Sequence, residues 1–211
     1  MKENTHSEKP DIELVLFDFG GVLAEEGFRE GLMSIARSNG LEPLEFYGKA
    51  VDIISETGYL TGCSDEKTFW QTLRRHLGVK GSDETLRNEI LSRFAIRQWM
   101  IDIIKGLKKL QVRLAVLSDQ TNWLDELDAE HDFLKFFDRV FNSFHMKKSK
   151  HDPSIFDDVL SFMGVTPDKS LFIDDRIDNV ERAKQRGLKT ILYRKRVTFE
   201  QELACFFPAL K

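Results

Sequence analysis

The sequence of 211 residues has few of the features that mark metal-thiolate, secreted or membrane proteins. It contains two cysteines, Cys63 and Cys205, without a Cys-x-x-Cys pattern, and its five histidines lack metal-ligand spacing. This excludes a thiolate or histidine metal site and favours a reducing compartment. The first ten residues are polar, and no apolar run approaches the length of a membrane span. We therefore expect a cytoplasmic protein without membrane contact and with a flexible tail over residues 1–11.

A strong charge of one sign is also absent. The formal net charge is −4, and basic residues gather only in two short segments, at 147–150 and 194–196. Nucleic-acid binding by electrostatic attraction needs a more basic surface than this. We expect no nucleic-acid partner, and the sequence does not indicate an oligomeric state.

What the sequence does contain is an apolar run that leads into a carboxylate. Residues 14–17 are all apolar, Asp18 follows, and Gly20 and Gly21 come next. A continuous apolar run is typical of a strand buried on both faces, and glycines after it permit a tight turn and close approach to a ligand. Because open α/β sheets bind ligands at the carboxyl ends of their strands, Asp18 is a candidate functional residue.

Residues 25–97 show helical periods and no strand pattern. Apolar residues recur three and four positions apart, and start and stop signals predict four helices, at about residues 25–38, 43–57, 65–77 and 82–97. We interpret this region as one inserted helical unit. The spacing of Tyr47, Phe69 and Trp70 favours packing inside that unit, and for Tyr59 packing is favoured over contact with a substrate.

Residues 98–211 alternate between helix and strand patterns. Strands are expected at 112–117, 139–142, 171–173 and 190–193, in addition to the first strand at 12–17. Alternation of this kind predicts a parallel sheet with helices on both faces. The expected fold class is α/β, a Rossmann-like doubly wound parallel sheet formed by residues 12–24 and 98–211, with an inserted α-helical cap domain at 25–97.

Several polar groups follow the expected strands. Right-handed crossovers bring the carboxyl ends of parallel strands to one edge, and there the sequence places Asp18, Ser118, the basic loop 147–150 and the pair Asp174 and Asp175. Carboxylates are hard ligands suited to Mg²⁺. A lysine balances their charge and binds a phosphoryl oxygen, and an aspartate can attack phosphorus.

These segments resemble the motifs of the haloacid dehalogenase-like (HAD) hydrolase superfamily. The family's first motif, Asp-x-Asp-Gly-Val/Thr after an apolar strand, is Asp-Phe-Gly-Gly-Val at residues 18–22. The second is a strand that ends in Ser or Thr, here Ser118. The third is a lysine before a helix, here Lys150, and the fourth is an acidic pair, here Asp174 and Asp175. The resemblance extends over about residues 12–193 and implies a HAD core with a small α-helical cap.

The resemblance also implies roles. Asp18 corresponds to the nucleophile, and Mg²⁺ is held by Asp18, the backbone carbonyl of Gly20 and the acidic pair. Asp175 is then a direct ligand, whereas Asp174 acts through water or on Lys150. Ser118 and Lys150 contact the phosphoryl group, although Ser118 could also simply cap the next helix. Asp119 lies on the substrate side, where dehalogenases of this family carry an asparagine near the substrate carboxylate.

Two positions depart from the family pattern. Gly20 replaces the second aspartate of the first motif, whose side chain in the family's phosphatases protonates the leaving group and then activates water. His151 replaces the proline that usually follows the lysine. The second departure leaves open whether Lys147 or Lys148 takes the role assigned to Lys150.

The leading hypothesis is a Mg²⁺-dependent phosphatase that acts on a small phosphorylated metabolite through an aspartyl-phosphate on Asp18. Without an acid at Gly20, good leaving groups such as sugar 1-phosphates are expected to react best. One alternative is a 2-haloacid dehalogenase, in which the halide leaves unprotonated, but Asp119 would repel a haloacid. The other is a catalytically degenerate HAD-fold module that binds a phosphorylated ligand or a protein.

Overall fold

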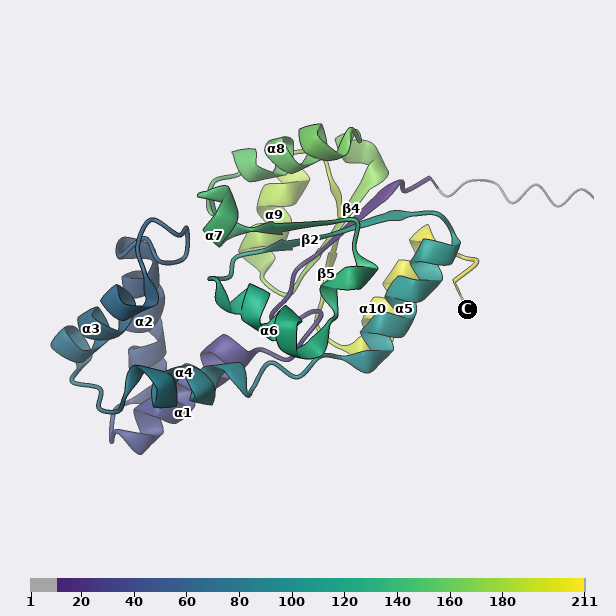
Figure 1. Cartoon of the computed structure of the whole chain (residues 1–211). Coiled ribbons are helices and arrows are strands. Elements are labelled where there is room, and N and C mark those ends of the chain that lie inside the picture. Colours follow the sequence, from purple (N-terminus) through teal and green to yellow (C-terminus); the bar gives the residue numbers. More distant parts are fainter. Residues whose placement is uncertain (1–10, 211) are drawn as a thin grey trace, which may run out of the picture.

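Five parallel strands form one sheet in the order β3-β2-β1-β4-β5 (Figure 1). The computed structural model describes residues 11–210, so the expected tail lies, except for Asp11, outside the described residues. The first strand is central, and its register sets Phe17 beside Val116 of one neighbour and Ile173 of the other. The strands are β1 (Leu14–Phe17), β2 (Arg113–Ser118), β3 (Arg139–Asn142), β4 (Ser170–Asp174) and β5 (Lys189–Leu192).

Helices cover both faces of this sheet, because the side chains of each strand alternate between the faces. Val15 and Phe17 belong to one buried cluster, and Leu14 and Leu16 to another. The first cluster includes residues of α5 (Gln98–Lys109), α6 (Trp123–His131) and α10 (Arg196–Phe206), and the second includes residues of α8 (Ser154–Met163) and α9 (Ile177–Gln185). The expected Rossmann-like α/β class is confirmed.

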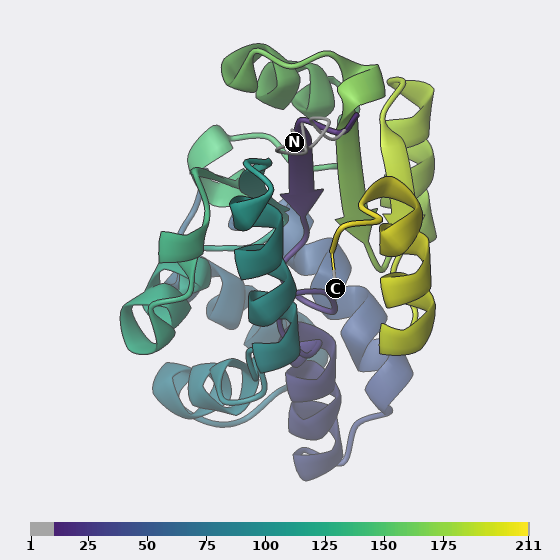
Figure 2. The ribbon, with the colours of Figure 1, turned by 90° about the vertical axis from the view of Figure 1, so that its right-hand side faces the viewer.

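The remaining long helices gather at one end of the molecule, away from the N-terminal end of β1 (Figures 1 and 2). They are α1 (Gly27–Ser38), α2 (Pro43–Glu56), α3 (Glu66–Leu77) and α4 (Asp83–Leu91). Close approach of α1 to α4 depends on Gly31, because a Cβ there would lie 2.6 Å from the Cα of Ile90. The arrangement supports the division into core and cap that we propose from the sequence.

Two antiparallel linkers connect this helical unit to the sheet. The backbone N–H of Glu25 donates to Ala95 O, and that of Arg97 donates to Leu23 O, both at 2.9 Å. The sequence prediction of a helix through residue 97 is therefore wrong, since α4 ends at Leu91. Residues 95–97 are extended because their backbone groups bond to the outgoing linker instead of to a preceding helical turn.

The final helix, α10, is not predicted by the sequence. Its fully buried residues are Phe199 and Leu203, too few to give a clear period. The Phe199 ring packs against the rings of Trp99 and Tyr193, with centroids 6.1 and 5.6 Å away. The strand predictions are confirmed to within two residues at each end. Short helices α7 (Ser143–Met146), η1 (Leu134–Phe136) and η2 (Pro167–Lys169) complete the fold.

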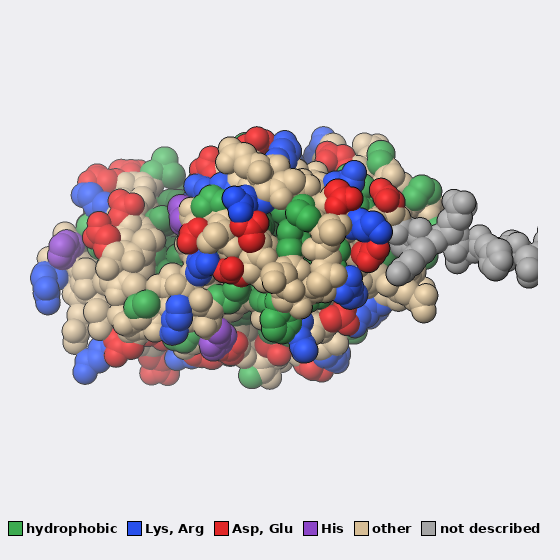
Figure 3. All heavy atoms as spheres, turned by 90° about the horizontal axis from the view of Figure 1, so that it is seen from above, with side chains coloured by type: hydrophobic (Ala, Val, Ile, Leu, Met, Phe, Trp, Pro, Cys, Tyr) green, Lys and Arg blue, Asp and Glu red, His purple; other side chains and the backbone are tan. Residues whose placement is uncertain are grey.

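The surface agrees with the modest net charge. On the face in Figure 3, acidic and basic side chains are interspersed rather than gathered by sign. Among the described residues, no helix combines the length and apolar composition needed to cross a bilayer.

Candidate active site

Asp18 stands at the carboxyl end of the central strand. Its backbone N–H donates to Ile173 O at 2.9 Å and so continues the ladder one residue beyond β1. The residue is 7% exposed, and its Oδ1 accepts a hydrogen bond from the backbone N–H of Phe19 at 2.7 Å. Burial on both sides of β1 therefore delivers one carboxylate, in a fixed orientation, to the edge where the parallel strands end.

The turn after Asp18 requires glycine at residue 21. Gly21 has φ +79°, in the left-handed region that favours glycine. A Cβ at this position would also lie 2.6 Å from the Cγ of Asp175. The absence of a side chain at Gly21 therefore lets the Asp175 carboxyl group pack against the turn.

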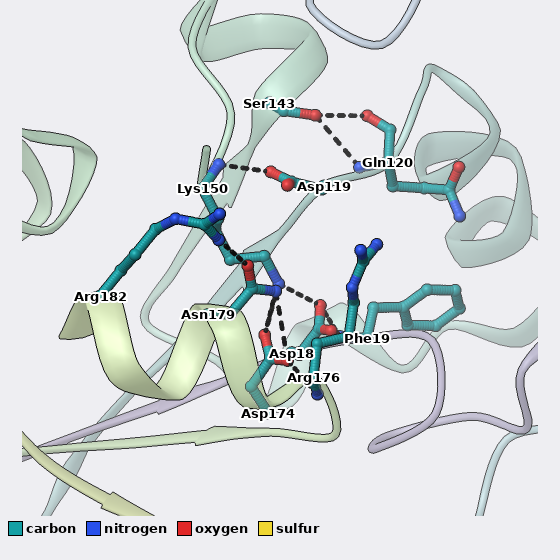
Figure 4. Close-up of polar contacts among 10 residues, drawn as sticks. All are labelled: Asp18, Phe19, Asp119, Gln120, Ser143, Lys150, Asp174, Arg176, Asn179 and Arg182. Carbon is teal, nitrogen blue, oxygen red and sulfur yellow. Dashed lines mark hydrogen bonds and ion pairs between the residues drawn. The ribbon is translucent and has the colours of Figure 1, made fainter. Parts of the chain in front are cut away.

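Lys150 lies between two carboxylates. Its Nζ is 2.9 Å from Asp18 Oδ1 and 2.7 Å from Asp174 Oδ2 (Figure 4). The lysine is only 1% exposed, and its backbone N–H donates to Asp119 Oδ1 at 2.8 Å. Burial lowers the pKa of Lys150, but the carboxylates of Asp174, Asp18 and Asp119 outweigh it, and the pKa lies above its usual value. Lys150 therefore stays protonated.

The two neighbouring lysines point elsewhere. Lys147 Nζ donates to the carbonyl of Gly62 at 2.7 Å. Lys148 Nζ donates to Ser154 Oγ at 2.9 Å and pairs with Asp158. Of the three lysines in this loop, the structure brings Lys150 to the carboxylates, and the helix that starts at Ser154 follows it as the sequence predicts.

The two members of the acidic pair have different surroundings. Asp174 is fully buried and accepts hydrogen bonds from the backbone N–H of Arg176 at 2.7 Å and from Asn179 Nδ2 at 3.0 Å, besides its contact with Lys150. Asp175 is half-buried and faces the cavity described below. Hydrogen bonds to both oxygens of Asp174 fix it in place, whereas Asp175 is open to a ligand.

Carboxylate oxygens of Asp18, Asp174 and Asp175 lie within 4.8 Å of one another. Three carboxylates face one buried cation, Lys150, so the cluster carries excess negative charge. Burial raises the pKa of Asp18 well above its usual value and raises that of Asp175, with repulsion from neighbouring carboxylates adding to both. A hard divalent cation with oxygen preference would relieve this repulsion, so the donor set fits Mg²⁺.

Ser118 ends β2 at the same edge, and Asp119 follows it. Ser118 is 2% exposed and lines the cavity next to Asp18. Asp119 is half-buried, and burial raises its pKa while the nearby Lys150 opposes the rise. Its bond to the Lys150 backbone holds the basic loop against the end of β2. Asp119 therefore positions the loop, and its contact with a substrate stays a prediction.

A cavity of about 370 Å³ opens over this cluster, between the sheet edge and the helical unit. Its walls are both polar and apolar, and two cationic residues that the sequence analysis does not assign to the site, Arg176 and Arg194, line it. Its lining from the sheet side includes Asp18, Gly20, Ser118, Asp119, Gln120, Lys150, His151, Asp175, Arg176, Asn179 and Arg194, and from the helical side Glu26, Phe28, Arg29, Tyr47, Val51, Ile54, Ser55, Leu60 and Phe94.

Some of these residues could have been found in the sequence. Arg176 comes directly after the acidic pair, Asn179 lies in the first turn of the next helix, α9, and Arg194 follows the last strand, β5, whose end meets the same edge. Arg194 Nη1 donates to Asp175 O at 3.0 Å. Tyr59 is not among the lining residues: it is 1% exposed, and its hydroxyl donates to Asn122 Oδ1 at 2.7 Å, which agrees with the packing role.

The order and placement of these groups are characteristic of one hydrolase family. A family model described as haloacid dehalogenase-like hydrolase matches residues 12–187. The chain belongs to the haloacid dehalogenase-like hydrolase family. The resemblance drawn from the four motifs is thus confirmed.

Curated relatives of this HAD-like hydrolase include phosphatases. The chain is 23% identical over 211 residues to the D-ribitol-5-phosphate phosphatase of Bacteroides thetaiotaomicron, with 91% of this chain and 97% of the relative covered. It is 26% identical over 183 residues to the phosphorylated carbohydrates phosphatase of Thermotoga maritima, with 85% and 84% covered.

A solved structure of a HAD family enzyme from Bacteroides thetaiotaomicron, in complex with magnesium and inorganic phosphate, superposes with a TM-score of 0.68. Its sequence is 22% identical, and 87% of this chain and 94% of that chain are covered. At this identity the likeness shows the shared fold.

Proposed function

We propose that this HAD-like hydrolase is a Mg²⁺-dependent phosphatase that hydrolyses small-molecule phosphate monoesters through an aspartyl-phosphate on Asp18. The observation that carries the proposal is the position of Asp18, paired with Lys150 and within ligand reach of Asp174 and Asp175. A buried carboxylate beside a cavity and a fixed cation matches what attack on a phosphoryl group requires.

Each of these residues has a separate role in the proposed reaction. Asp18 attacks phosphorus, and the ester oxygen departs as the leaving group. Lys150 and Ser118 contact phosphoryl oxygens, and Asp174 keeps Lys150 in place. Asp18, Asp175 and the carbonyl of Gly20 would hold Mg²⁺, which draws negative charge from the phosphoryl group when it is bound. Water then attacks the aspartyl-phosphate and releases inorganic phosphate.

The cavity and the relatives support sugar phosphates and related polyol phosphates as the substrate class. Arg29, Arg176 and Arg194 line the cavity with hydrogen-bond donors, and the relatives named above act on a phosphorylated polyol and on phosphorylated carbohydrates. Sugar 1-phosphates belong to this class. A restriction to good leaving groups would depend on there being no acid near Gly20, and the Glu26 carboxylate approaches that position.

The two alternatives are less well supported. A haloacid dehalogenase would bring a substrate carboxylate toward the half-buried carboxylate of Asp119, at an electrostatic cost. It would also have no need of the cluster of three aspartates. A binding module without catalysis would not need the Asp18 carboxylate oriented by Phe19 and Lys150.

A phosphate-release screen tests the proposal. Purified protein is incubated with a panel of sugar, polyol and aryl phosphates, with Mg²⁺ and with EDTA. We expect phosphate release that EDTA abolishes and Mg²⁺ restores. Halide release from 2-haloacids that survives EDTA would instead support the dehalogenase. No turnover of any ester at high protein concentration would support the binding module.

A further inference from the structure

Gly20 leaves an open position beside the nucleophile. Its φ is not in the left-handed region, so an L-residue fits the backbone there. A Cβ on Gly20 would meet the Phe94 ring at 3.4 Å, an ordinary contact, and then Glu26 Oε2 at 3.9 Å. A carboxylate from elsewhere in the chain thus reaches the space that the side chain of residue 20 would occupy.

That carboxylate is held in place from the cap side. Glu26 precedes α1, and its Oε1 accepts a hydrogen bond from the backbone N–H of Arg29 at 3.1 Å. The next residue, Gly27, packs so closely that a Cβ there would lie 2.6 Å from the Phe94 ring. Glu26 is half-buried and lines the same cavity as Asp18. One carboxylate oxygen therefore caps the helix while the other approaches residue 20.

We propose that the Glu26 carboxyl group is the general acid and base of this enzyme and replaces the aspartate missing at residue 20. The inference rests on the proposed phosphatase activity. As an Asp18 oxygen bonds to phosphorus and the bond from phosphorus to the leaving oxygen breaks, the Glu26 proton passes to that oxygen. The resulting Glu26 carboxylate then takes a proton from water as the water oxygen bonds to phosphorus. The Asp18–phosphorus bond breaks, and phosphate, the Asp18 carboxylate and protonated Glu26 are regenerated.

The electrostatic surroundings favour this role. Burial raises the pKa of Glu26, and the hydrogen bond from the backbone N–H of Arg29 and the charge of Arg176 oppose the rise without cancelling it. A raised pKa increases the protonated fraction near neutral pH. The alternative is a purely structural role, in which Glu26 only caps α1. A test must therefore distinguish catalysis from capping.

The Glu26→Gln variant makes that separation, because the amide oxygen still accepts the Arg29 hydrogen bond but the acid and base are lost. Rates are measured over esters whose leaving groups differ in pKa. The wild type should show a shallow dependence. On alkyl phosphates the rate of the variant should fall by about 10²–10⁴-fold, the usual contribution of a positioned acid. On aryl phosphates the rate of phosphoryl transfer to Asp18 should fall much less, because a phenolate leaves without protonation.

A second readout does not depend on the leaving group. In Glu26→Gln, an aryl phosphate should still phosphorylate Asp18, but removal of the phosphate should be slow, so a burst of the phenol precedes a slow steady state. Glu30→Gln, which removes an exposed carboxylate from the first turn of α1, is the matched control and should behave as the wild type. Adding Gly20→Asp to Glu26→Gln should restore a large part of the rate on alkyl phosphates.

Glu26→Asp guards against failure of the glutamine variant to fold, because aspartate caps helices well but its shorter side chain withdraws from residue 20. It should lose rate on alkyl phosphates while keeping wild-type stability. The inference would be overturned if these variants kept the wild-type rates on alkyl phosphates and the wild-type dependence on leaving-group pKa and showed no burst of phenol. That result would leave the proposed phosphatase activity intact. A wild-type enzyme that hydrolyses no phosphate ester would overturn the proposed function itself.

Discussion

Lys150 and Asp18 form an ion pair in which both side chains are almost completely removed from solvent. The Nζ to Oδ1 distance is 2.9 Å, and the exposed fractions are 1% and 9%. The pair joins loop 147–150 to the end of the central strand, and Asp174 extends it to β4. Three segments far apart in the sequence are thus held together by one ammonium group at the position where chemistry is proposed.

Removing that ammonium group should destabilise the protein as well as inactivate it. Lys150→Met leaves the buried carboxylates without their cation, and the loss of one partner from a buried pair costs about 3–5 kcal/mol of unfolding free energy. Urea unfolding in the presence of EDTA measures this loss of unfolding free energy. Lys148→Met is the control, because Lys148 pairs with the exposed Asp158 and should change little. Equal stabilities of the two variants would contradict the structural role of Lys150.

Gly21 should be irreplaceable for two separate reasons. Gly21→Ala forces alanine into a left-handed conformation at about 1–2 kcal/mol and pushes a methyl group into the Asp175 carboxylate. Gly40 has φ +69° with nothing within 4 Å of an added Cβ, so Gly40→Ala isolates the backbone cost. We expect Gly21→Ala to lose more unfolding free energy than Gly40→Ala and, in addition, to lose activity.

Mg²⁺ should stabilise the folded protein through Asp175. A ligand that binds only the native state raises the melting temperature, so thermal unfolding with increasing Mg²⁺ should shift upward in the wild type. Asp175→Asn should abolish most of this shift. Asp178→Asn, which removes an exposed carboxylate in the first turn of α9, should retain it. A full shift in Asp175→Asn would show that the cation binds elsewhere.

The sequence predicts most of what positions the site, because the responsible signals are local. Apolar runs in the sequence indicate buried strands, and the residues at the carboxyl ends of β1, β2 and β4 meet because parallel strands end at one edge of the sheet. The expectation that Asp18, Ser118 and Asp174 lie at one edge needs no more than this. Apolar patterns do not predict elements with few buried residues, such as α10.

Other features depend on contacts between distant segments. Three lysines within four residues have similar local sequence, and only the path of the loop, with Lys147 at φ +58° ending α7, sends Lys150 inward. The approach of Glu26 to residue 20 depends on packing across Phe94, more than sixty positions along the chain. The Gly20 departure, read alone, predicts a missing acid, whereas the fold supplies a carboxylate from the cap side.

In the proposed mechanism the phosphoryl group is transferred to Asp18, so trapping the aspartyl-phosphate tests the mechanism at its key step. The enzyme is mixed with Mg²⁺ and an aryl phosphate, quenched in acid within one turnover, and its peptides are analysed by mass spectrometry. We predict phosphate on the peptide that contains Asp18, more of it in Glu26→Gln, and none in Asp18→Asn, which should be folded but inactive. Release of inorganic phosphate without phosphorylation of Asp18, or phosphorylation of another residue instead, would contradict the role of Asp18 as nucleophile.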